Sequence, residues 1–240
     1  MIKFFRKIRQ RLLSENKFSK YLIYAIGEIV LVVIGILIAL SINNWNTKKN
    51  NQSKEKDALT EILQDLKSDN EELKKIKTEE GNIVKIIGFL NQEKEQRGKF
   101  TKDSLQVYLG KALVGNRAKF VNTAYNVLTS SDIGLIQDKD VRYLIAQYYE
   151  REIPTIERDA DDTYVEWYDF ILPVIRKEAD YWVWGEILIP YSMDSIFQNK
   201  ELFKILKTNV HNHTSVELTA NRVLLENEKL IKKIELLIIK

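Results

Sequence analysis

Residues 21–42 read YLIYAIGEIVLVVIGILIALSI, an apolar stretch of 22 residues with a single charged side chain, that of Glu28. At a rise of ~1.5 Å per residue, an α-helix over this stretch is ~33 Å long, which is enough to cross the hydrocarbon core of a bilayer. The stretch therefore predicts one transmembrane helix, and with it a single-pass protein that is anchored in membrane lipid.

The charges on either side of this stretch predict its orientation. Residues 1–20 carry seven Lys and Arg side chains and one acid, a net charge of +6, whereas the few lysines after residue 42 are accompanied by Glu55 and Asp57. Because basic segments remain on the cytoplasmic side, we expect a cytoplasmic N-terminus and a C-terminal part on the opposite side of the membrane. The rest of the chain has 30 basic and 33 acidic side chains, so we predict no binding to nucleic acid.

A cleaved signal peptide is the alternative interpretation of the same stretch. Ala39-Leu40-Ser41 resembles a small-residue cleavage site that follows a basic segment. The apolar stretch is, however, about twice as long as the apolar region of a signal peptide, and Glu28 lies inside it. We therefore predict a retained signal anchor.

Two short regions that flank the predicted span suit a membrane surface. In residues 1–20, aromatic and aliphatic side chains gather near one helical face with basic residues between them, which is the pattern of a helix on an anionic leaflet. A basic segment that only sets the topology fits these residues equally well. Beyond the span, residues 43–52 are expected to form an interfacial collar whose indole ring lies at the outer headgroup level. The membrane-interface residues that we predict are Phe4, Phe5, Arg6, Arg9 and Trp45.

The composition favours an all-α fold for the rest of the chain. Only 3 prolines and 9 glycines occur in 240 residues, which suits long helices better than short strands joined by turns. The absence of cysteine excludes disulfide bonds, a thiol catalyst and a cysteine-containing zinc site. Residues 53–240 are long enough to bury a core, and we expect them to form a domain that is a bundle of long helices.

Hydrophobic periodicity predicts where these helices lie. From Leu59 to Leu90, apolar residues recur with spacings of three and four, which predicts a helix over about residues 53–93. Asp69 and Glu80 are the polar exceptions in this seam, so we expect the helix to lie along its neighbours with a partly hydrated seam. Turn and capping signals predict further helices at about residues 101–114, 122–129, 138–177 and 216–239, and a brief helix capped by Asp194. Pro154 is expected to kink or restart the helix over 138–177.

One face of the predicted transmembrane helix carries the residues that we expect at a helix–helix interface, which are Glu28, Val32, Gly35 and Ala39. Gly35 and Ala39 form a pair of small residues that lets two helices approach closely, so we predict self-association through this face. The Glu28 carboxyl, which is costly to bury in lipid, is then either a structural group between helices or a group that responds to protons or ions. Stator-type proteins, which couple ion flow to motion outside the membrane, illustrate the second role.

The opening MIKFFRKIRQRLLSENKFSKYLIYAIGEIVLVVIGILIALSINNWN, residues 1–46, resembles the N-terminal signature of a family of uncharacterised single-pass membrane proteins from Bacteroidota, known only as a domain of unknown function. Residues 124–149 are similar to the middle motif of that family, although the Ser-Gly turn is expanded here to Ser-Asp-Ile-Gly. The resemblance implies an inner-membrane protein with a periplasmic helical domain. It implies no activity, cofactor or catalytic residue.

Three further groups of residues have two interpretations each. His211 and His213 are two residues apart with no clear third metal ligand nearby, so we expect surface histidines rather than a metal site. The acidic residues between positions 157 and 166 are interpreted as a solvated helix face rather than a cation site. The tyrosines and tryptophans between positions 143 and 191 either pack in the core or form a surface for a ligand or a partner.

The sequence contains no GxSxG, Walker, HExxH or dinucleotide-binding motif. We therefore predict a non-enzymatic structural or interaction protein, without a catalytic residue, cofactor or metal, that self-associates through its span and the helical stalk after it. Other membrane or periplasmic proteins are further expected partners. The alternative is an ion-coupled subunit of a membrane complex that uses Glu28 to transmit force.

Overall fold

The computed structural model describes residues 18–239, of which 84% are helical. The all-α fold class is therefore confirmed. In chain order the helices and strands are α2 (Phe18–Glu95), α3 (Lys102–Ala112), α4 (Thr123–Ser131), η1 (Ile133–Leu135), α5 (Lys139–Gln147), η2 (Tyr148–Glu152), α6 (Ile153–Glu166), η3 (Trp167–Ile171), α7 (Leu172–Glu178), β1 (Ala179–Val183), β2 (Ile187–Pro190), α8 (Met193–Gln198) and α9 (Lys200–Ile239). The chain divides into two compact units, Met1–Lys54 and Glu55–Lys240.

In the first unit, the described residues form the N-terminal part of α2. The large apolar side chains between Leu22 and Ile42 are 46–69% exposed. The most apolar window has a mean hydropathy of 2.8, and none of it is buried. This helix is long and apolar enough to cross a membrane.

Helix α2 continues without a break through residues 43–52, so the prediction of a helix that begins near Ser53 was wrong. The reason lies in the sequence between Gly35 and Gly81, which contains neither glycine nor proline and therefore offers no residue that ends a helix. At its C-terminal end the predicted boundary is close, because α2 ends at Glu95 and the turn follows.

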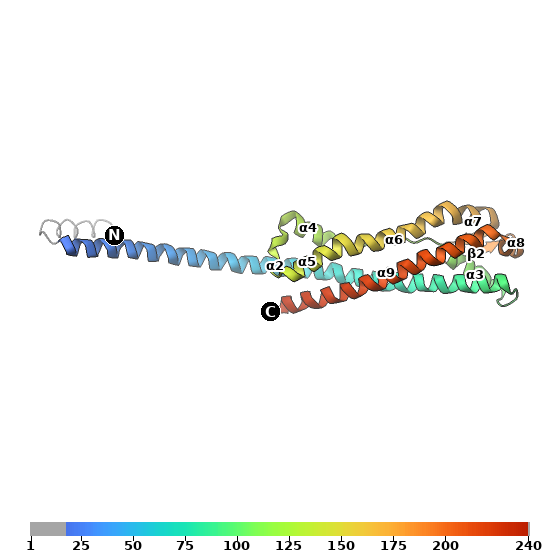
Figure 1. The fold of residues 1–240 in the computed structure, drawn as a ribbon, viewed down its shortest axis with the longest axis horizontal. Helices are drawn as coiled ribbons and strands as arrows, with labels where there is room; N and C mark the ends of the chain where they lie inside the picture. Colours follow the sequence, from blue (N-terminus) through green and yellow to red (C-terminus); the bar gives the residue numbers. More distant parts are fainter. Residues whose placement is uncertain (1–17, 240) are drawn as a thin grey trace. The chain divides into compact units, whose positions relative to one another are not determined.

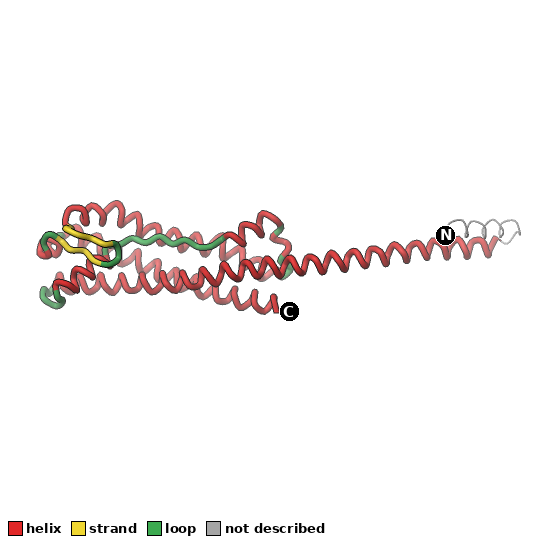
Figure 2. The backbone as a smooth tube through the Cα atoms, turned by 180° about the vertical axis from the view of Figure 1, so that it is seen from behind, coloured by secondary structure: helices red, strands yellow, loops and turns green. Residues whose placement is uncertain are grey.

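Three long helical stretches lie side by side in the second unit (Figures 1 and 2). They are α2 from Glu55 onward, the nearly continuous series α5–η2–α6–η3–α7, and α9. Contacts of α9 with α2 run from the pair Lys67–Glu235 to the pair Glu80–His213, so these two helices are antiparallel. The α5–α7 series is also antiparallel to α9 and therefore runs parallel to α2.

Both internal prolines of the α5–α7 series follow a π-helical turn. Pro154 comes after η2, and Pro173 comes after η3. A proline ring removes a backbone donor and crowds the preceding turn, which a wider π turn accommodates. At Pro154, where we predict a kink or a restart, the helix changes from π to α with α6 beginning at Ile153, and the backbone stays helical through Glu152 and Ile153.

The buried apolar residues of the second unit form two cores. The first core is built on Leu59–Ile76 of α2, and the second on Ile83–Leu90 of the same helix. All eight apolar residues of the predicted seam are at most 8% exposed, which confirms the spacing argument. The capping residues Thr101 and Asp138 are also confirmed, since each side chain accepts hydrogen bonds from backbone N–H groups in the first turn of its helix.

Two features of the C-terminal part differ from prediction. Residues 179–190 form an antiparallel hairpin that turns at Gly185, where φ is +70°, whereas we predict no strand from the sequence (Figure 2, yellow). Helix α9 begins at Lys200 rather than near residue 216, because Leu202 and Leu206 extend its buried face toward the N-terminus. The brief helix α8 was predicted, but its cap is Ser192 instead of Asp194.

Candidate functional site

The predicted membrane face lies in the first unit and is open in the structure. A Cβ atom added at Gly35 meets no atom within 4 Å, and Val32 is 57% exposed. Glu28 is of intermediate exposure and takes part in an interaction within the chain. Trp45 is 65% exposed, with the Lys49 ammonium 5.6 Å from its ring centroid. The predicted interface residues Phe4, Phe5, Arg6 and Arg9 lie outside the described residues.

In the second unit, a polar layer joins four segments through buried side chains. The Oε2 atom of Glu80 on α2 lies 2.5 Å from Nδ1 of His213 on α9, and both side chains are at most 1% exposed. The Nδ2 group of Asn116 donates to Oε1 of Glu80 at 2.7 Å. Thr163 of α6 holds Asn116 in place, because its hydroxyl accepts from the Asn116 backbone N–H. We call these four residues the Glu80 layer.

The Glu80 layer separates the two apolar cores. On α2, Glu80 lies between Ile76 of the first core and Ile83 of the second. On α9, His213 precedes Val216 of the first core and follows Val210, which packs against the second. Because burial of an unpaired polar group is costly, this layer favours one alignment of the helices over neighbouring ones.

A second polar cluster lies within the first core, around Asp69. Its carboxylate accepts hydrogen bonds from the Val121 backbone N–H at 3.0 Å and from the Tyr148 hydroxyl at 3.1 Å. Asn227 of α9 donates to the same hydroxyl at 3.0 Å and accepts from Asn70 at 2.8 Å. Burial raises the pKa of Asp69 to about 6, although the two hydrogen bonds oppose this shift. Burial likewise raises the pKa of Tyr148.

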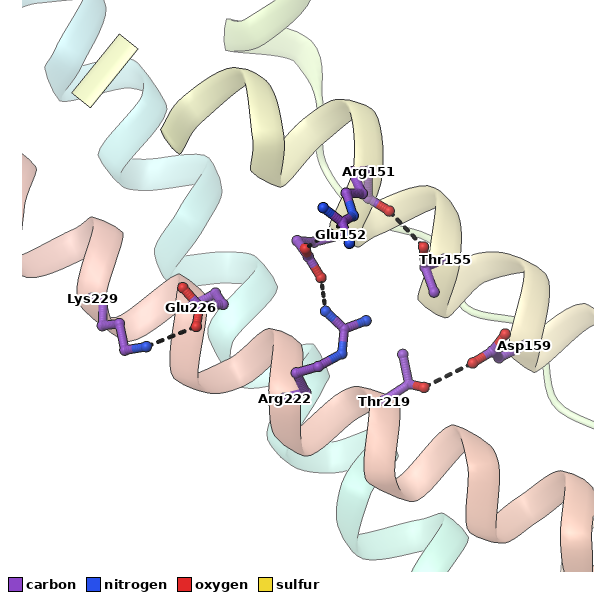
Figure 3. Close-up of polar contacts among 8 residues, drawn as sticks. All are labelled: Arg151, Glu152, Thr155, Asp159, Thr219, Arg222, Glu226 and Lys229. Carbon is purple, nitrogen blue, oxygen red and sulfur yellow. Dashed lines mark hydrogen bonds and ion pairs between the residues drawn. The ribbon is translucent and has the colours of Figure 1, made fainter. Parts of the chain in front are cut away.

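A third set of polar contacts joins the last residue of η2 and helix α6 to α9 (Figure 3). The Glu152 side chain, which is 4% exposed, pairs with the guanidinium group of Arg222. Along the same helices, the Thr219 hydroxyl donates to Asp159 at 2.8 Å. These contacts reinforce the alignment of η2 and α6 with α9, because each carboxylate has one partner on α9.

The structure corrects two predictions about polar residues. His213 is fully buried, so the prediction of two surface histidines was wrong for it, while His211 is exposed. The seam of α2 is closed to bulk solvent at its polar positions, since Asp69 and Glu80 are each 1% exposed and bonded to protein groups. Spacings of three and four that continue from Val216 toward the N-terminus reach His213, and this signal was available in the sequence.

The acidic and aromatic groups divide between surface and core. Asp161 pairs with Arg117 at 3.1 Å, and among residues 18–239 no cluster of three or more potential metal ligands of the His, Cys, Asp and Glu types occurs. Tyr148, Tyr149 and Trp167 are buried in the two cores. Five other tyrosines and tryptophans of that region are exposed, namely Tyr143, Tyr168, Tyr181, Trp184 and Tyr191.

Comparison with known proteins identifies one family. The sequence model of a family of unknown function, DUF6090, matches residues 28–158, which is more than half of the chain. The match includes Asp69 with both of its hydrogen-bond partners, Val121 and Tyr148. It also includes Glu80 and Glu152 but ends before α9, which carries their partners His213 and Arg222. No curated protein and no solved structure matches the chain.

Replacement of Asp69 by Asn is expected to change how stability depends on pH. The ordinary pKa of 3.8 rises to about 6 on folding, so the folded state binds this proton more tightly than the unfolded chain. The resulting stabilisation is complete below about pH 4 and is lost as the pH rises through 6. Asp69→Asn should therefore be more stable than the wild type by about 1–3 kcal/mol at pH 7, with the difference vanishing near pH 4.

Urea unfolding of the full chain in mild detergent, at several pH values between 4 and 7, measures this difference. The exposed Asp103→Asn change serves as the control and should keep the wild-type pH profile. If the difference in the free energy of unfolding between Asp69→Asn and the wild type stayed constant with pH, the raised pKa of Asp69 would be contradicted.

Replacement of Arg222 by Met is expected to destabilise the second unit by about 1–3 kcal/mol, because the buried Glu152 carboxylate then keeps only the exposed guanidinium of Arg151, 3.9 Å away. The matched control is Lys74→Met, which removes a cation from the exposed pair Lys74–Glu71 and should cost less than about 1 kcal/mol. Thermal unfolding followed by circular dichroism compares the two variants. An equal decrease in the free energy of unfolding for both variants would show that the burial of Glu152 does not strengthen its ion pair with Arg222.

Proposed function

Since the chain belongs to the DUF6090 family of unknown function, which assigns it no activity, we propose from its own residues that it is a membrane-anchored structural or interaction protein without enzymatic activity. Residues 21–42 are the anchor, with the N-terminus in the cytoplasm and the second unit in the periplasm. The resemblance of residues 1–46 supports an inner membrane of a Bacteroidota cell as the location.

One observation carries this proposal: the apolar surface of α2 before residue 43 is covered by nothing in the described chain. Exposed apolar surface costs about 25 cal/mol per Å² in water, so a helix that is apolar on all sides requires lipid or another helix around it. The second unit differs, because its apolar residues are gathered into two cores that polar layers hold in alignment. This combination suits a rigid exterior part carried on a membrane anchor.

We propose that the chain self-associates through the span and the stalk, which is the part of α2 that follows the span. The open face at Gly35 and Ala39 supports the first contact, because small residues allow the close backbone approach on which helix packing in lipid depends. Lipid, a second copy of the chain and other membrane or periplasmic proteins are the partners of this function.

Enlargement of this face is the direct test. Gly35→Ile combined with Ala39→Ile should shift the protein extracted in mild detergent from an oligomer to a monomer, since the added side chains hold the helices apart. Ser41→Ile, on the opposite side of the helix, is the control and should leave the mass unchanged. Light scattering or native mass spectrometry gives the mass. A monomeric wild type, or a soluble form that lacks the first forty residues, would overturn the proposal.

The second candidate function is the ion-coupled subunit, favoured by Glu28 as the single acid of the span. Two substitutions separate the candidates. Glu28→Gln keeps the ability to hydrogen-bond, whereas Glu28→Ala does not. If Glu28 is structural, the oligomer should survive in the Gln variant and weaken in the Ala variant. If Glu28 carries protons or ions, cells should lose the protein's function equally with either change while the oligomer persists with Gln.

A further inference from the structure

The second unit contains a groove that the proposed structural role does not use. It has a volume of 540 Å³ and lies between the last turns of α2, the segment after α3 and the turn of the hairpin. Ile86, Phe89, Val114 and Trp184 contribute its apolar surface. Sites for small molecules typically enclose ~300–1,000 Å³ and are mostly apolar with a few polar groups, so this groove has the size and composition of such a site.

The aromatic walls of the groove are exposed but held in place. Trp184 is 41% exposed, and its ring packs edge-on against the buried Trp167 with centroids 4.4 Å apart. Phe89 is 36% exposed and lies 5.6 Å from Phe100 and 5.5 Å from Tyr108 between centroids. Walls that are already ordered lose little conformational freedom when a ligand binds, which favours binding.

One polar residue of the groove, Asn116, also belongs to the Glu80 layer. Asn116 lines the groove and is held by Thr163 through its backbone and by Glu80 through its side-chain amide. A ligand in this groove would therefore contact a residue that belongs to the buried polar layer. The Asn116 side chain thus lines the groove and also takes part in the polar layer that aligns the long helices.

The charged side chains of the groove indicate which charge a ligand should carry. Lys85 and Lys111 line it, and in the described part of the chain neither ammonium group has an ion-pair partner. Glu79 is the single acid among the lining residues, which gives the groove a net charge of +1. A carboxylate matches this charge, whereas a phosphate monoester carries a charge of about −1.5 to −2 at neutral pH and exceeds it.

We propose that this groove binds a small amphiphilic carboxylate, with its apolar part against Phe89 and Trp184 and its anionic group near Lys85 and Lys111. The site goes beyond the structural role, because it adds a ligand to the second unit. The apolar part gains from leaving water, and the two lysines recognise the carboxylate by charge.

The test uses 2-naphthoate as the probe, with the full chain in nonionic detergent and the heat of dilution into empty micelles subtracted. Isothermal titration should show saturable binding of 2-naphthoate, at least tenfold weaker binding of the neutral 2-naphthamide, and weaker binding of 2-naphthyl phosphate. Equal affinity for the acid and the amide, or no saturable binding of the acid, would overturn the proposal.

Two variants locate the binding on the protein. Lys85→Gln combined with Lys111→Gln should weaken 2-naphthoate binding at least tenfold, while the matched double change Lys204→Gln and Lys207→Gln, at exposed positions of α9, should leave it unchanged. Asn82→Trp fills the groove from an exposed lining position and should abolish binding. All these positions are exposed, so circular dichroism should show intact helices. Unchanged affinity for 2-naphthoate in either groove variant would contradict the site. An equal decrease in affinity for the two double lysine variants would contradict it as well.

Discussion

The buried contact between Glu80 and His213 is the constraint on which the second unit depends. Apolar seams that repeat every three or four residues tolerate a shift of one helix along another, because many alignments bury similar surface. The carboxylate of Glu80 and the imidazole of His213 do not tolerate such a shift. Each is at most 1% exposed, and a shift would leave both without hydrogen-bond partners in an apolar core. The contact thus selects one alignment of α2 with α9, and Asn116 and Thr163 extend it to the loop and to α6.

This polar layer also explains why the unit has two cores instead of one. Apolar clusters form on either side of it, and each is tied by its own polar groups: Asp69 with Tyr148 and Asn227 in the first, and the Leu113 carbonyl with the Trp167 indole in the second. The groove at Trp184 borders the layer, because Asn116 takes part in both. The proposed ligand site therefore shares one side chain with the layer that aligns the helices.

Helix α2 meets two different surroundings along its length, and its sequence changes accordingly. Between Leu22 and Ile42 it is apolar on all sides and uncovered by the described chain, as expected for a helix that faces lipid or a second copy. Between Leu59 and Leu90 it has a single apolar stripe, and that stripe is buried against the other long helices. One continuous helix is therefore long and apolar enough to cross a membrane in one part and is a core element in the other.

The sequence by itself determined the features that arise from local interactions. These are the apolar span, the seam of α2 and the caps at Thr101 and Asp138, all of which depend on residues within a few positions of one another. Tertiary structure alone decided the pairing of His213 with Glu80, 133 positions away, and the pairing of Glu152 with Arg222, 70 positions apart. It also decided the hairpin at residues 179–190, where the backbone of β2 packs closely against Gly110 of α3. The physical reason is that a polar or aromatic side chain becomes stable in a core only when a distant segment supplies its partner.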